Sequence, residues 1–131
     1  MEGKGERPPA EKHQNLRDRY LQFGIRIIRT GMGLPNDDVG RVVRRQIIGC
    51  GTSAGANYEE ACGAESRMDF VHKMRVVLKE LREPRYWLRL ILAAQLLPES
   101  RLVGICAEAD ELISITVKSV KTARSRFNAN S

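Results

Sequence analysis

Apolar residues recur every three or four positions through most of the chain, which is the spacing of one face of an α-helix. Leu16, Tyr20 and Phe23 begin the first of these runs. The second run starts at Val39, and its period continues to Ala61. Two further runs follow in the second half of the chain. The pattern therefore predicts four helices, at about residues 15–32, 37–62, 66–96 and 98–126.

Helix-start signals precede three of the four segments. Asn36–Asp38 supplies side-chain oxygens and negative charge where the second helix begins. Ser66 and Asp69 have the spacing of a capping box at the start of the third helix, and Pro98 suits the first turn of the fourth. Pro84 lies inside the third helix, where it removes a backbone hydrogen bond, so we expect a kink near Pro84.

The order of these segments indicates the fold class. No stretch alternates apolar and polar residues as a strand does, and the links between the helices are short. We therefore predict an all-α, antiparallel up-down-up-down four-helix bundle that forms a single domain over residues 15–127. Residues 1–14 are polar and contain Pro8 and Pro9, so we expect them to form a disordered arm.

The stretch IIGCGTSAGAN, residues 47–57, matches two catalytic signatures. Gly49–Ala54 fits a dinucleotide-binding turn, and Gly51–Gly55 fits the elbow that presents a serine nucleophile. Both signatures need a strand before the glycines, whereas the helical period runs straight through them. We therefore expect no enzyme activity, and we interpret Gly51 and Gly55 as a groove of small residues that another helix contacts closely.

Composition and charge limit the kinds of molecule that the chain is expected to bind. The 131-residue chain has a net charge of +6, and its second half, residues 66–131, contributes most of the excess, which favours a polyanionic partner such as nucleic acid. The three cysteines are widely spaced and odd in number, as is typical of a reducing cytoplasm. The chain starts without an apolar run, and no segment approaches the ~20 apolar residues of a membrane span. We therefore expect a cytoplasmic protein with no membrane partner.

The sequence lacks the residue pattern of a metal site in a helical bundle. A di-iron bundle needs two Glu-x-x-His motifs. This chain offers only Asp69-x-x-His72, and its other histidine, His13, lies in the expected arm. We therefore expect no metal, no cofactor and no small-molecule substrate.

A stripe of basic residues with one aromatic runs along the third predicted helix, roughly 140° around the helix from the core stripe. Its members are Arg75, Lys79, Arg82, Tyr86 and Arg89. Cations beside an exposed ring suit phosphate contacts and base stacking. The alternative is a solvated face on which Lys79 and Glu83 form an ion pair. Further candidates for nucleic-acid contact are Arg44 and Arg45 in the second helix and Lys118, Lys121 and Arg124 near the end of the fourth.

The third helix also carries apolar residues away from its core stripe, namely Val76, Trp87, Leu90 and Ile91. A helix that is apolar on more than one side needs a cover beyond its own bundle. We therefore expect self-association, with Trp87 at the interface.

Glu59 and Glu60 lie at the end of the second helix, where the helix dipole disfavours negative charge. Two kinds of partner are open: Arg67, across the turn in the same chain, or an arginine of a neighbouring subunit.

Three stretches together resemble a known family: GTSAGANYEEACGAES, DFVHKMRVVLKELREPRYWLRLIL and AEADELISITVKSVKTAR. Over about residues 16–126, the chain is similar to bacterial four-helix-bundle proteins of the 23S ribosomal RNA intervening-sequence type. The resemblance implies four antiparallel helices and a ring-like homopentamer. Some members are encoded within an insertion in the large-subunit ribosomal RNA gene. A related fold is an accessory protein of retroelement reverse transcriptases and binds nucleic acid. The resemblance implies no catalytic residues.

Two functions remain open at this point. One is an oligomeric module that binds RNA or another nucleic acid. The other is a protein-interaction scaffold or accessory subunit, for example of a reverse transcriptase, with no direct role in nucleic-acid binding.

Overall fold

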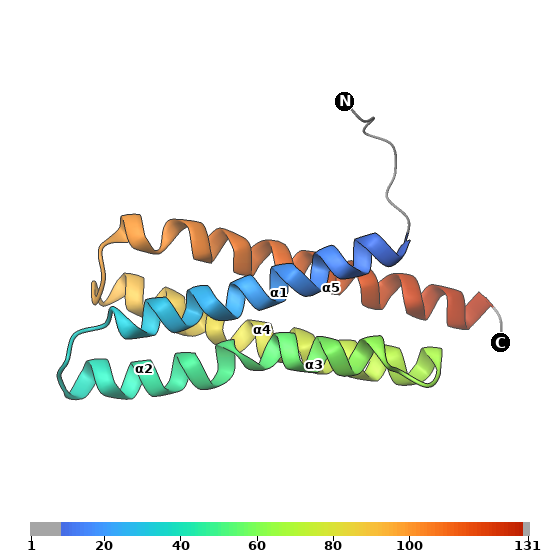
Figure 1. The fold of residues 1–131 in the computed structure, drawn as a ribbon, viewed down its shortest axis with the longest axis horizontal. Coiled ribbons are helices and arrows are strands. Elements are labelled where there is room, and N and C mark those ends of the chain that lie inside the picture. The colour runs from blue at the N-terminus through green and yellow to red at the C-terminus, as the bar shows by residue number, and fades with distance from the viewer. Residues whose placement is uncertain (1–8, 130–131) are drawn as a thin grey trace, which may run out of the picture.

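The computed structural model describes the backbone of residues 9–129 and the side chains of residues 15–126. The described residues form helices and contain no strand. α2 and α3 follow one another directly, so the chain forms four helical arms (Figure 1). The elements are α1 (Pro9–Met32), α2 (Asp38–Gly51), α3 (Ser53–Cys62), α4 (Arg67–Ala93), the 3-10 turn η1 (Glu99–Arg101) and α5 (Val103–Ala129).

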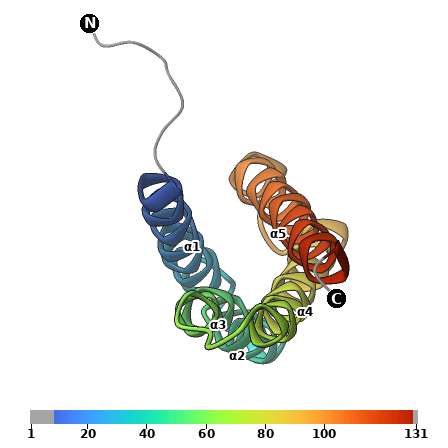
Figure 2. The same cartoon turned by 90° about the vertical axis from the view of Figure 1, so that its right-hand side faces the viewer.

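The four arms lie along a common long axis (Figure 1). Seen end-on in Figure 2, the arms follow one another around a curve from α1 through α2, α3 and α4 to α5, and α1 and α5 are also in contact with each other. α4 packs against both neighbours, the α2–α3 arm and α5. This arrangement leaves the outer sides of α2 and α4 free of any other element of the chain.

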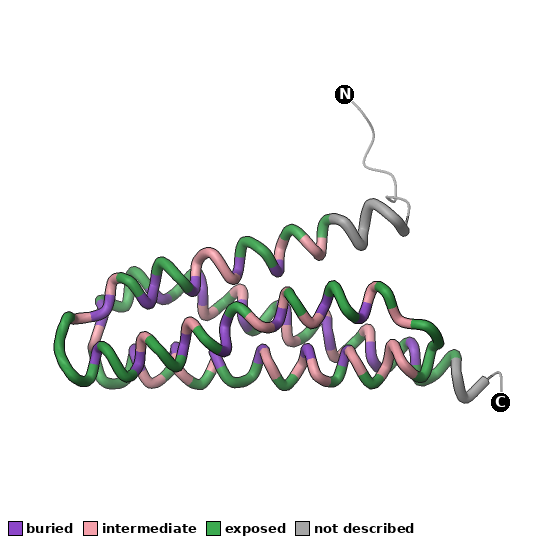
Figure 3. Tube along the Cα trace, turned by 60° about the horizontal axis from the view of Figure 1, so that its bottom comes forward, coloured by how far each residue is buried: buried purple, intermediate pink, exposed green. Residues whose placement is uncertain are grey.

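The core lies where the inner sides of the arms meet. Buried positions recur about once per turn along each arm in Figure 3, as the apolar period of the sequence requires. Aliphatic side chains dominate this core, and burial of each one contributes about 1.5–3 kcal/mol to folding. Fully buried examples from four helices are Ile27, Ile47, Leu81 and Leu112.

One polar contact joins α1 to α5 inside the core. The Tyr20 hydroxyl lies 2.6 Å from Thr116 Oγ1, and Thr116 in turn donates to the Leu112 carbonyl at 2.7 Å. The Tyr20 ring stacks on Tyr58 of α3 with 4.8 Å between the ring centroids. Burial raises the pKa of Tyr20 to about 12, so the phenol stays neutral and holds three arms together.

The caps expected at the starts of α2 and α4 are confirmed. Asp37 Oδ1 accepts a hydrogen bond from the Gly40 amide at 2.8 Å, and Ser66 Oγ accepts one from the Asp69 amide at 3.0 Å. The Asp69 carboxylate accepts from the Glu65 amide at 3.2 Å, one residue before the Ser66 amide that a capping box uses. Each cap satisfies amides that the first helical turn leaves without a partner.

The first two helices differ from the expected boundaries. α1 begins at Pro9, so residues 9–14 of the expected disordered arm are helical, and residues 1–8 lie outside the described residues. The second helix is not continuous, because it is interrupted at Thr52. Thr52 Oγ1 donates to the Ile48 carbonyl at 2.8 Å, and Ser53 Oγ donates to the Gly49 carbonyl at 3.0 Å. Such side-chain bonds to carbonyls four residues back compete with the helical ladder.

The end of α4 differs from expectation, whereas the kink near Pro84 stays a prediction. Pro84 is buried and α4 continues through it without a break. The helix ends at Ala93 rather than at residue 96 because Gln95 adopts a left-handed backbone with φ 57°. The Leu96 amide donates to the Ile91 carbonyl at 3.0 Å, which is the closing bond of a Schellman motif.

The last helix begins later than the sequence suggests. Pro98 has an extended backbone, with φ −61° and ψ 144°, and therefore lies outside the helix instead of in its first turn. The 3-10 turn Glu99–Arg101 follows, and α5 starts at Val103. No helix among the described residues is long and apolar enough to cross a membrane.

Candidate functional site

The basic stripe of α4 lies on the outer side of the helix, where its side chains are exposed to solvent. Its members are Arg75, Lys79, Arg82, Tyr86 and Arg89. The Tyr86 side chain is 55% exposed. None of the four cations has a carboxylate oxygen within 4.0 Å among the described side chains, so the alternative pair between Lys79 and Glu83 is not formed. The four charges are therefore available to an external anion.

Other basic residues of the chain are paired internally, which sets the stripe apart. Arg19 donates to both oxygens of Glu108, at 3.1 and 2.8 Å, and this bidentate contact ties α1 to α5. Arg85, on the flank of α4 that faces α5, pairs with Asp110. The cations on the packed flanks of the helices are therefore neutralised by carboxylates, whereas the cations on the outer side of α4 are not.

The stripe extends further towards the start of α4 than the sequence reasoning proposed. Met68 and His72 continue the alternating spacing of three and four residues, and both side chains are exposed. Together with Ser66, Asp69, Val71 and Arg75 they line a shallow hollow of about 550 Å³. The same seven-residue period that identified Arg75 could have identified these two positions.

Arg44 has a structural role that the sequence did not indicate, and its assignment to nucleic-acid contact stays a prediction. Its Nε donates to the Gly31 carbonyl at 2.9 Å, and its Nη2 donates to the carbonyls of Leu34, at 2.9 Å, and Pro35, at 3.3 Å. The guanidinium thus satisfies carbonyls at the end of α1 and in the following turn. Arg45, its neighbour, is exposed.

The basic group of α5 remains on the surface. Lys118, Lys121 and Arg124 are exposed, and none of them forms an ion pair with a described carboxylate. The helix continues to Ala129, so only Arg126 occupies its last turn. The helix dipole acts mainly on the last turn, so it does not account for Lys118, Lys121 and Arg124.

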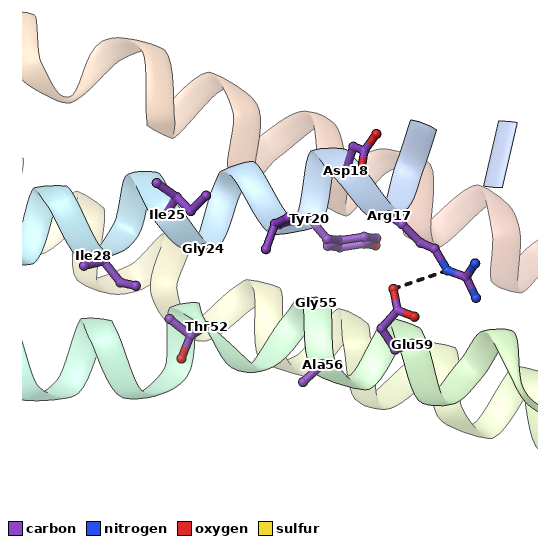
Figure 4. A pocket seen from close by; sticks show the side chains of 11 residues that line it. Arg17, Asp18, Tyr20, Gly24, Ile25, Ile28, Thr52, Gly55, Ala56 and Glu59 are labelled. Carbon is purple, nitrogen blue, oxygen red and sulfur yellow. Dashed lines mark ion pairs between the residues drawn. The ribbon is translucent and has the colours of Figure 1, made fainter. Parts of the chain in front are cut away.

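A second surface feature is an apolar groove between α1 and the α2–α3 junction, shown in Figure 4. It encloses about 640 Å³. The ion pair between Arg17 Nε and Glu59 Oε2, 3.2 Å apart, crosses one end of it. We define the groove by Leu21, Gly24, Ile25 and Ile28 of α1 and by Thr52, Gly55 and Ala56 on the opposite side.

Gly51 and Gly55 face α1, in line with the close helix contact expected for these two glycines. A Cβ atom on Gly51 would lie 2.5 Å from Ile27 Cγ2, so α1 and α2 are in contact across bare backbone. A Cβ atom on Gly55 would lie 3.4 Å from Tyr20 Cβ, which is an ordinary contact distance. Gly51 is therefore required by the packing of the chain, whereas Gly55 is not.

The predicted second apolar flank of α4 is partly buried within its own chain, and the position of Trp87 at an interface stays a prediction. Ile91 is fully buried in the core, and Val76, Trp87 and Leu90 are half-buried. Trp87 and Leu90 pack against the core of their own chain. The exposed aliphatic side chains lie elsewhere, chiefly on α1 and α2: Leu21, Ile28, Met32, Val39 and Val42.

The two glutamates at the end of α3 do not pair with Arg67. Glu59 pairs instead with Arg17 of α1, which lies far from it in the sequence. Glu60 is exposed and forms no ion pair among the described side chains.

The geometry around Ser53 does not correspond to a nucleophile elbow. The Ser53 hydroxyl donates within the helix turn, to Gly49, and no strand precedes it among the described residues. Cys50 is buried, and burial raises its pKa to about 12, which leaves it a poor nucleophile. The described residues contain no group of three His, Cys, Asp or Glu side chains that could hold a metal ion.

The chain is similar to a known protein family and to a solved structure. A sequence model of the family described as 23S rRNA-intervening sequence protein matches residues 11–118. Among solved structures, the chain is similar to a protein of unknown function from the S23 ribosomal protein family of Bacteroides thetaiotaomicron, with 33% identity and a TM-score of 0.75. The match covers 81% of this chain and 98% of that chain. No curated protein matches the chain.

Proposed function

The chain belongs to the 23S rRNA-intervening sequence protein family, and from that premise we propose that it is a non-enzymatic, cytoplasmic homo-oligomer that binds RNA or another nucleic acid through α4. One observation carries the proposal. Arg75, Lys79, Arg82 and Arg89 form a line of exposed cations without carboxylate partners among the described side chains. Such a line suits a chain of phosphates, because each neutralised phosphate releases condensed counterions.

Tyr86 adds a preference for unpaired bases. Its ring lies within the line of cations and is exposed on the outer side of α4. An aromatic face beside a basic track stacks a base of a single strand, whereas the bases of a duplex are stacked on one another. Met68 and His72 lengthen the same surface at its N-terminal end.

The assembly is proposed to be a ring-like homopentamer of antiparallel up-down-up-down four-helix bundles. Support for the helix order comes from the short links at residues 33–37 and 63–66. Support for assembly comes from Leu21, Met32 and Val42, which are 60%, 71% and 61% exposed. Exposed aliphatic side chains of this size on neighbouring helices are typical of an interaction surface.

Salt dependence tests the proposed binding surface directly. With a short unstructured RNA, the logarithm of affinity should fall with the logarithm of salt concentration with a slope of about −3 per subunit, since four contacts contribute about 0.7 each. Tyr86→Ala should weaken binding to the single strand and leave the slope nearly unchanged, because stacking releases no counterions. A duplex of equal charge serves as the comparison. Absence of binding to both ligands at low salt would contradict the proposal.

A scaffold or accessory-subunit function is the alternative, and the apolar groove between α1 and α3 favours it. In that case a specific protein would stay bound at high salt, because burial of apolar surface is not screened. The RNA titration would then show no dependence on the α4 cations.

A further inference from the structure

The hollow on the outer side of α4 adjoins the basic stripe and differs from it in chemistry. It encloses about 550 Å³ and is lined by Ser66, Met68, Asp69, Val71, His72 and Arg75. Met68 is 63% exposed, and His72, one turn further along, is exposed as well. Because Arg75 belongs to both the hollow and the stripe, a strand that is bound along the stripe reaches the hollow directly.

Met68 and His72 offer surfaces on which a flat ring can rest. The imidazole ring of a histidine stacks on unpaired bases, as larger aromatic side chains do. The thioether of a methionine makes favourable contacts with aromatic rings, and its unbranched side chain adapts to their shape. Tyr86 lies about 20 Å from His72 along α4, since a helix rises about 1.5 Å per residue. The surface therefore offers a place for a base towards each end of the stripe, with cations between them.

Asp69 supplies the hollow with a hydrogen-bond acceptor. Its Oδ2 accepts from Lys73 Nζ at 3.0 Å and from the Glu65 amide at 3.2 Å, whereas its Oδ1 accepts from no described residue. The hydrogen bond from Lys73, together with the one from the Glu65 amide, lowers the pKa of Asp69, so the carboxylate is ionised at neutral pH. An ionised carboxylate only accepts hydrogen bonds. The free oxygen is therefore satisfied by a ligand that presents an N–H or O–H group.

We infer that the hollow binds one unpaired base of the RNA and selects bases with an exocyclic amino group over uracil, with Asp69 as the acceptor for that amino group. The inference rests on the proposed RNA binding and adds a base preference to it. Cytosine and uracil have nearly the same shape, but cytosine carries an amino donor where uracil carries a carbonyl oxygen. A carboxylate accepts from the cytosine amino group. The uracil oxygen would instead place two acceptors against each other, with no proton between them.

Two RNA strands that differ chiefly in this group test the preference. They are oligocytidylate and oligouridylate of equal length and charge, titrated against the full chain at neutral pH and low salt. The wild-type chain should bind oligocytidylate about tenfold more tightly, which is the scale of one hydrogen bond to a charged group. Asp69→Asn should bring the ratio of the two affinities close to one, because an amide both donates and accepts.

Glu65→Gln is the matched control. It removes one negative charge four residues before Asp69, at a side chain that does not line the hollow, so it should keep the wild-type ratio. His72→Ala should weaken the binding of both strands about fivefold or more and leave the ratio unchanged, since base stacking tolerates any sequence. Both variants should keep their helical circular dichroism.

Each possible failure has a distinct meaning. Equal affinity of the wild-type chain for the two strands, or the wild-type ratio in Asp69→Asn, would overturn the base preference. Unchanged affinity in His72→Ala would overturn the placement of a base in the hollow. The proposed RNA binding would survive these three results and fails only if neither strand binds at low salt.

Discussion

Replacing Gly40 with alanine is expected to lower the free energy of unfolding by about 3 kcal/mol. A Cβ atom at this position would lie 1.7 Å from the Pro35 carbonyl oxygen, which is a backbone atom that cannot rotate away. The Gly40 amide also donates to the Asp37 side chain at 2.8 Å. Relief of the clash therefore displaces the start of α2 and breaks its cap.

Thermal and urea unfolding measure this loss. Gly63→Ala is the control, because its Cβ atom would lie 3.7 Å from the nearest atom, the Glu60 carbonyl oxygen, and its stability should change by less than about 0.5 kcal/mol. Equal stability of the Gly40 and Gly63 variants would show that the turn before α2 is looser than the structure indicates.

Reversing Arg75 and Arg82 together to glutamate should weaken RNA binding on the order of a hundredfold at low salt. Hydrogen bonds to charged groups contribute about 1.5 kcal/mol each, and two are lost. The slope of affinity against salt should also flatten by about 1.4 for a single strand, because two counterion-releasing contacts disappear. Both side chains lie on the outer side of α4, so the helical circular dichroism should not change.

The matched control reverses Arg29 and Arg101, which are exposed on α1 and η1, outside the stripe. It makes the same change in net charge and should leave the slope close to that of the wild type. Equal losses from the two double variants would mean that the net charge of the chain, and not the α4 stripe, governs binding.

The inward faces of the helices could be predicted from the sequence because a single period of apolar residues defines them. Phe23, Ile47 and Leu81 are buried as that period requires. The caps at Asp37 and Ser66 were also predictable, since a cap depends on residues three positions apart. These features are local, and local sequence determines them.

Features that depend on contacts between distant segments could not be predicted in the same way. Trp87 lies on an apolar flank, but only the fold shows that it packs in part against the core of its own chain. Arg44 was indistinguishable from Arg45 until the end of α1 placed three carbonyls beside its guanidinium. The pairing of Glu59 with Arg17 likewise depends on α1 lying beside α3.

Part of the candidate site could likewise be predicted from local sequence, and part of it could not. The stripe of α4 was predictable because it repeats the helical period on the side opposite the core. The groove was only half predictable, since Gly51 and Gly55 indicated a close helix contact but not the exposed aliphatic walls on α1. Leu21, Ile25 and Ile28 form those walls. Their spacing of four and three residues defines a second apolar stripe on α1, beside the stripe that faces the core.

Native mass spectrometry of the full chain, with and without a short unstructured RNA, tests the central claim most directly. Without RNA, we expect a closed assembly at a fixed multiple of the 14.8 kDa chain mass, five copies for the proposed ring. With RNA, we expect the same assembly plus the mass of the RNA, and no such addition for the chain with Arg75 and Arg82 reversed. A monomer that gains no mass from RNA would contradict both the proposed assembly and the proposed RNA binding.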